Sequence, residues 1–169
     1  MLYLVRHGMT DACERKVLKS LHKDVPLNAV GRTQILQKVL PVLYKASYSP
    51  TTMIQKIMTS PVMRTVETAE IIQKNLDNFP PLQVEPLLFN KTKYESFRIP
   101  LLEWIYGLKR ESLHPEMHIV AVTHGRIIRM LHSLWKTGDI DQPYDEPIVY
   151  GAVVPIPLDE FLNETTKKK

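Results

Sequence analysis

The sequence contains a single cysteine, Cys13, so no disulfide bond can form within the chain. Structural disulfides are typical of oxidising compartments, and their exclusion favours a reducing one. No apolar run approaches the ~20 residues that a membrane-spanning helix needs. Arg6 and His7 interrupt the first apolar run, so it does not resemble a signal peptide. We therefore expect a cytoplasmic protein with no membrane contact.

The chain also lacks a strong excess of one charge. Its formal net charge is +4, and the three lysines at 167–169 supply much of it. A basic nucleic-acid-binding face is therefore not expected. The 169 residues, 44% hydrophobic and 24% charged, suit one globular domain with a full core. We expect this domain to span 1–163, followed by a disordered basic tail at 164–169.

Short apolar runs alternate along the chain with segments of helical periodicity. The alternation predicts a three-layer α/β/α sandwich with a mostly parallel central sheet. Pro41 should kink or end the first long helix, and Pro155 should place the last strand at a sheet edge or strand end. The expected strands are 1–5, 54–59, 82–84, 119–123 and 148–156, and the expected helices are about 28–43, 62–76, 101–108 and 126–135.

Two histidine–glycine pairs follow buried strands. Arg6, His7 and Gly8 come directly after the first strand, and His124 with Gly125 comes after the strand at 119–123. In open α/β sheets, ligands bind at the carboxyl ends of the strands. Arginine forks and positively charged histidine suit a phosphoryl group, and a neutral imidazole can attack phosphorus. The sequence thus predicts an anion site at this edge.

A third basic residue follows the strand at 54–59. Arg64 stands in the first turn of the next predicted helix, where a cation is unfavourable unless an anion lies near. From there its side chain can reach the same sheet edge. Gly8 would let the backbone approach the bound anion closely.

Four motifs in order resemble the histidine phosphatase superfamily, the phosphoglycerate-mutase-like group. The chain opens with a strand and Arg-His-Gly. Residues 24–34 (DVPLNAVGRTQ) resemble the family segment Asp-x-x-Leu-Thr-x-x-Gly-x-x-Gln. Residues 60–70 (SPVMRTVETAE) resemble Ser-x-x-x-Arg-x-x-x-Thr-Ala-Glu, and residues 122–125 (VTHG) resemble the late Val-x-His-Gly. One such motif would be weak evidence, but the ordered set is specific.

The resemblance implies His7 as nucleophile, with Arg6, Arg64 and His124 forming the phosphate pocket. It implies no metal and no organic cofactor. Further expected substrate contacts are Gly8, Thr10, which fits the family's Ser or Thr after Arg-His-Gly, and Gly125. Arg126 is either a surface residue or a specificity contact with the far end of the substrate.

The departures from the family pattern concern the general acid above all. Phe89 stands where many relatives carry the glutamate that protonates the leaving oxygen, and Glu95 is the nearest substitute, with Glu85 just before the match. Glu95 is more simply a solvated carboxylate, but it stays the candidate acid. Cys13 replaces a common asparagine, and Leu21 a common glycine. The short phosphohistidine phosphatases of the family resemble this chain in length and in lacking the acid.

Three functions remain open. The first is a phosphatase acting on a phosphomonoester or phosphoramidate through phospho-His7, with a phosphorylated small molecule or phosphoprotein as substrate. The second is a weak or inactive family member that binds a phosphorylated ligand or a protein partner. A mutase is less favoured, because the segment between Leu82 and Met117 leaves little room for a substrate-enclosing insert. The sequence does not indicate an oligomeric state.

Overall fold

The computed structural model describes residues 1–15, 24–46, 53–89, 94–111, 117–142 and 146–160, without the side chains of 94–97 and 111. Five strands form one sheet in the order β3-β2-β4-β1-β5. The first four strands run parallel, and β5 pairs antiparallel with β1 at the sheet edge. The mostly parallel sheet is therefore confirmed. The strands are β1 (Leu2–Arg6), β2 (Ile54–Thr59), β3 (Leu82–Val84), β4 (His118–Thr123) and β5 (Val153–Ile156).

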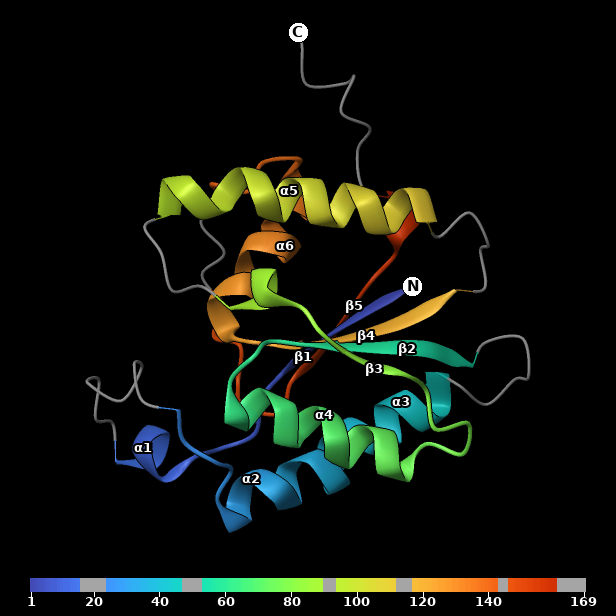
Figure 1. The fold of residues 1–169 in the computed structure, drawn as a ribbon. Helices are drawn as coiled ribbons and strands as arrows, with labels where there is room; N and C mark the ends of the chain where they lie inside the picture. The colour runs from blue at the N-terminus through green and yellow to red at the C-terminus, as the bar shows by residue number, and fades with distance from the viewer. Residues whose placement is uncertain (16–23, 47–52, 90–93, 112–116, 143–145, 161–169) are drawn as a thin grey trace, which may run out of the picture.

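Helices cover both faces of this sheet, as predicted (Figure 1). On one face lie α2 (Ala29–Gln34), α3 (Leu40–Ala46) and α4 (Met63–Asn75), and on the other lie α5 (Tyr94–Glu111) and α6 (Gly125–Thr137). Alternate side chains of the central strands supply both cores. In β1, Leu2 and Leu4 pack with α5 and α6, whereas Tyr3 and Val5 pack with the helices of the opposite face.

The helical segment after Asn28 continues through Pro41 to Ala46. The side chain of Asn28 accepts a hydrogen bond from the Gly31 amide at 2.9 Å and so caps α2, as its sequence position predicts. A wider π-helical stretch, Ile35–Val39, lies just before Pro41. Such a stretch accommodates a residue that lacks an amide hydrogen and crowds the preceding turn. The helical segment therefore passes through Pro41 and does not end there.

Other boundaries differ from the sequence prediction. A short helix, α1 (Asp11–Glu14), lies between the first predicted strand and the first predicted helix, where no helix was expected. Helix α5 begins at Tyr94 and contains Pro100, where a later start was expected. The last strand is shorter than predicted, because residues 148–152 turn toward the carboxyl ends of β1 and β4. Gly151 permits this turn, because its φ is 70°.

None of the described helices is long and apolar enough to cross a membrane. Residues 161–169 lie outside the described part of the chain, so the predicted domain end at 163 and the basic tail stay predictions.

Candidate active site

The carboxyl ends of β1, β2 and β4 meet at one point of the sheet edge. The His7 amide donates to the Thr123 carbonyl at 3.1 Å, and the Ser60 amide donates to the Val122 carbonyl at 3.1 Å. The rings of His7 and His124 consequently lie edge to face, with centroids 5.2 Å apart. The structure therefore brings together the two histidines that the sequence placed at separate strand ends.

His7 is held as a neutral imidazole with a defined tautomer. Its side chain is buried, with 4% exposed, and its Nδ1 lies 2.8 Å from the Gly8 carbonyl oxygen. A carbonyl only accepts hydrogen bonds, so Nδ1 carries the proton and Nε2 keeps its lone pair. Burial, with smaller contributions from Arg64 and Arg6, lowers the pKa of His7 to about 3. His7 is thus a candidate nucleophile at neutral pH.

His124 stands at the start of α6. Its Nε2 lies 3.1 Å from the Ser60 hydroxyl oxygen, which orients the ring. Burial, together with His7, Arg64 and Arg6, lowers the pKa of His124 to about 2. The expectation of a positively charged histidine is therefore corrected: His124 is neutral in this structure. A bound phosphate dianion would counter the two arginines and raise this pKa.

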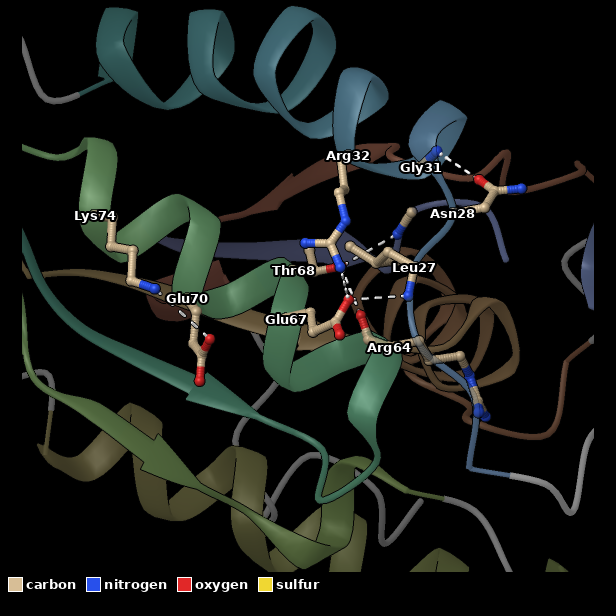
Figure 2. A network of polar contacts seen from close by, with 10 residues as sticks. Leu27, Asn28, Gly31, Arg32, Arg64, Glu67, Thr68, Glu70 and Lys74 are labelled. Atoms are coloured by element: carbon tan, nitrogen blue, oxygen red, sulfur yellow. Dashed lines mark hydrogen bonds and ion pairs between the residues drawn. The ribbon is translucent and has the colours of Figure 1, made fainter. Parts of the chain in front are cut away.

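Arg64 lies in the first turn of α4, and its side chain is 5% exposed. Burial lowers its pKa, and its charge contributes to lowering the pKa of both histidines. Its predicted contact with a phosphoryl group stays a prediction. Glu67, one turn along α4, is bonded to the Leu27 amide at 3.0 Å and to Arg32 at 2.9 Å. Figure 2 shows the Arg64 guanidinium extending away from this pair. Its charge is therefore not taken up by Glu67.

Arg6 ends β1 and is enclosed by three groups. Its guanidinium carbon lies 3.7 Å from the centroid of the Tyr150 ring, and its Nη1 donates to the Ile148 carbonyl. A Cβ on Gly125 would come within 3.4 Å of the guanidinium, so this glycine lets Arg6 lie against the start of α6. Within the described residues, the buried Arg6 Nε has no hydrogen-bond partner. Burial lowers the pKa of Arg6.

The glycine after His7 packs against α2. A Cβ on Gly8 would lie 2.6 Å from the Gly31 carbonyl oxygen, so Gly8 permits close packing of this loop on α2. Its amide donates to the Thr68 hydroxyl at 3.3 Å.

The remaining predicted substrate contacts are placed as follows. Thr10 is buried, and its hydroxyl caps α1 by accepting from the Cys13 amide at 3.2 Å. Gly125 is buried against Arg6, and Arg126 is exposed on α6. Contacts of these residues and of Gly8 with a substrate stay predictions.

The position expected to hold the general acid does reach the site. The ring of Phe89 lies 5.3 Å from that of His124, centroid to centroid. Glu85 accepts from the Leu87 amide at 3.0 Å and so caps a short 3-10 helix, Pro86–Leu88. Glu95 lies in the first turn of α5, but its side chain is outside the described part. The structure thus places an aromatic ring beside His124 at this position.

Two residues that contact the site side chains, Ser60 and Tyr150, were not predicted from the sequence. Ser60 opens the matched segment at 60–70 and follows a strand, which was a usable signal. Tyr150 had none: it stood inside a predicted strand, although its ring lies against Arg6 and 5.5 Å from the His7 ring. Cys13 lies near both arginines, although no catalytic pattern surrounds it in sequence.

Comparison with known proteins agrees with this arrangement. The family model for the histidine phosphatase superfamily (branch 1) matches residues 2–90, just over half of the chain. No curated protein matches the sequence.

Solved structures with the same fold share less than a quarter of their residues with this chain. The α-ribazole phosphatase from Shigella flexneri has a TM-score of 0.70 at 18% identity, and the match covers 90% of this chain and 87% of the phosphatase chain. The phosphoglycerate mutase from Bacillus anthracis has a TM-score of 0.68 at 15% identity, covering 90% and 85%. A mycobacterial glucosyl-3-phosphoglycerate phosphatase in complex with VO3 has a TM-score of 0.67 at 18% identity, covering 90% and 88%. These likenesses establish the fold.

Proposed function

The chain belongs to the histidine phosphatase superfamily, and we propose that it hydrolyses a phosphomonoester or phosphoramidate through a phosphohistidine intermediate on His7. The observation that carries the proposal is the state of His7. Its Nδ1 donates to the Gly8 carbonyl, its pKa is lowered to about 3, and two arginine charges lie near it. A neutral, oriented Nε2 beside two cations is what covalent attack on a phosphoryl group requires.

The proposed reaction has two steps. In the first, His7 Nε2 attacks phosphorus, a P–N bond forms, and the P–O or P–N bond to the leaving group breaks with its electron pair on the leaving group. In the second, water attacks phosphorus and releases a proton to the solvent, from which the expelled leaving group takes one up; the P–N bond breaks with its electron pair on His7 Nε2, and phosphate leaves. Arg6 and Arg64 balance the negative charge of the transferring group, and His124 donates a hydrogen bond to it. We propose that no metal takes part, because the two guanidinium groups provide this charge.

The substrate class follows from the position of Phe89. A phenyl ring cannot protonate a leaving oxygen, so the favoured substrates release a group that needs little help. Phosphoramidates such as phosphohistidine, aryl phosphates and acyl phosphates have this property, whereas sugar and glycerate phosphates do not. We propose a phosphorylated small molecule or phosphoprotein with such a leaving group.

Phe89 also favours one alternative. A family member with the phosphoryl pocket but no acid could bind a phosphorylated ligand or protein partner with little or no turnover. The arginines and His7 are equally suited to both functions, so only a rate measurement separates them.

The test is hydrolysis of an aryl phosphate by the purified protein, with His7→Ala as control. We expect release of phosphate by the wild-type protein and none above background by the variant. A folded wild-type protein that binds inorganic phosphate but hydrolyses neither aryl phosphate nor phosphohistidine would refute the proposed hydrolysis and support the binding function.

A further inference from the structure

Arg6 is a proposed phosphate ligand, and two of the groups that enclose its guanidinium lie outside the family motifs. It ends β1, next to the nucleophile, and its flat face lies on the Tyr150 ring with 3.7 Å between guanidinium carbon and ring centroid. A cation over an aromatic face at this distance is attracted to it. Because Arg6 must present its N–H groups to one fixed point, a contact that sets the plane of the guanidinium matters to its function.

The other contacts of Arg6 are with backbone groups. The Ile148 carbonyl accepts from Nη1, and the Gly125 backbone lies against the guanidinium. Nε is buried and lacks a partner among the described residues. Two of the three enclosing groups, Ile148 and Tyr150, belong to the turn before β5, so this turn fixes the arginine.

The hydroxyl of Tyr150 also makes contacts. It is hydrogen-bonded to Arg6 and to the thiol of Cys13, a residue of α1. Burial, followed by the hydrogen bond to Cys13, raises the pKa of Tyr150, so the phenol stays protonated at neutral pH. The ring also lies 5.5 Å from the His7 ring. Tyr150 therefore connects α1, the nucleophile and Arg6.

We propose that Tyr150 is a positioning residue, which orients the Arg6 guanidinium for the phosphoryl group through its aromatic face. The proposal rests on the proposed phosphoryl site, and it adds a residue that no family motif of this chain contains. We assign this role to the aromatic face, and we assign to the hydroxyl, which is hydrogen-bonded to Arg6 and to Cys13, the anchoring of the ring. Tyr150→Phe should therefore keep the function that Tyr150→Leu loses.

The experiment measures binding of inorganic phosphate by calorimetry, and aryl phosphate hydrolysis beside it. We expect Tyr150→Leu to weaken phosphate binding about tenfold and to lower kcat/KM by at least that factor, through loss of the cation–π contact. Tyr150→Phe should restore both to near the wild-type values. Val149→Ala, an exposed neighbour in the same turn, is the matched control and should change neither.

Unfolding temperatures show which variants are folded. A folded Tyr150→Leu protein that binds phosphate as the wild type does would overturn the proposal. So would a Tyr150→Phe protein as impaired as Tyr150→Leu, because the hydroxyl would then carry the effect. Wild-type protein that binds phosphate without turnover would refute the proposed catalysis alone, since the binding comparison still tests Tyr150.

Discussion

The two ends of the site are built differently. At the phosphoryl end, His7 follows β1 and Arg64 lies in the first turn of α4, and both side chains are buried. Ser60 orients the ring of His124. At the leaving-group end, Phe89 lies against His124 where a carboxylate was expected. Under the proposed function, the chain therefore has the groups that would bind and attack phosphorus, and it has a phenyl ring at position 89, which cannot protonate an alkoxide. We infer that the leaving group, and not the phosphoryl pocket, limits what this protein can hydrolyse.

The largest expected effect is a steep dependence of rate on leaving-group pKa. General acid help is commonly worth about 100- to 10,000-fold, so aryl phosphates should exceed alkyl phosphates in kcat/KM by a factor in this range. A series of substituted phenyl phosphates beside glycerol and sugar phosphates measures the slope. Similar rates for alkyl and aryl esters would show that an acid is present, and they would refute the inference that the leaving group limits hydrolysis.

The phosphoryl end is tested by Arg64→Ala. Loss of one charged donor from a closed oxyanion site costs about 3–4 kcal/mol, so kcat/KM should fall by about 100-fold or more for every leaving group. Arg32→Ala is the matched control, because Arg32 pairs with Glu67 on the surface at 2.9 Å and should change little. A large loss confined to alkyl esters would show that Arg64 acts on the leaving group and not on the phosphoryl group.

The leaving-group end is tested by adding the missing carboxylate. Phe89→Glu should speed hydrolysis of alkyl phosphates by about tenfold or more relative to aryl phosphates, because a protonated carboxyl can then serve as acid. Phe89→Gln is the matched control, with the same shape and no proton to give. If both variants behave alike on the two ester classes, the position does not act on the leaving group.

Much of this contrast was readable from the sequence. Motif order placed Arg6, His7, Arg64 and His124 together, because each follows a strand or opens a helix and parallel strands end at one edge. The absence of an acid at Phe89 was also readable. The protonation state of His124 was not, because burial depends on packing by both helical layers. Tyr150 was missed because its position depends on the turn at Gly151, which the alternating apolar pattern of 148–156 conceals.

The lowered pKa values of His7 and His124 should also make the protein acid-sensitive. Unfolded histidine binds a proton below its ordinary pKa of 6.5, whereas folding lowers the pKa of His7 to about 3 and that of His124 to about 2. Acid therefore favours the unfolded state, and each histidine lowers the free energy of unfolding by roughly 1.4 kcal/mol per pH unit below 6.5. Urea unfolding between pH 7 and pH 5 measures the slope.

His124→Gln should reduce that slope more than His132→Gln, because the pKa is lowered to about 2 in His124 and by a smaller amount in His132. Equal slopes in the wild type and both variants would contradict the neutral state of His124.

The smallest expected effect is that of Glu95→Gln. If no carboxylate protonates the leaving group, this change should leave kcat/KM for alkyl and aryl esters within about twofold of the wild type, as for an ordinary surface substitution. A loss confined to alkyl esters would identify Glu95 as the acid after all.

The central claim, covalent catalysis by His7, is tested most directly by trapping the intermediate. Wild-type protein mixed with a labelled aryl phosphate and quenched in alkali should carry a phosphoryl group that acid removes, since phosphohistidine is acid-labile. Peptide mapping should place the label on His7; His7→Ala should lack it, whereas His132→Ala should retain it. A protein that hydrolyses the substrate with no acid-labile label, or a His7→Ala variant with near wild-type turnover, would contradict the account.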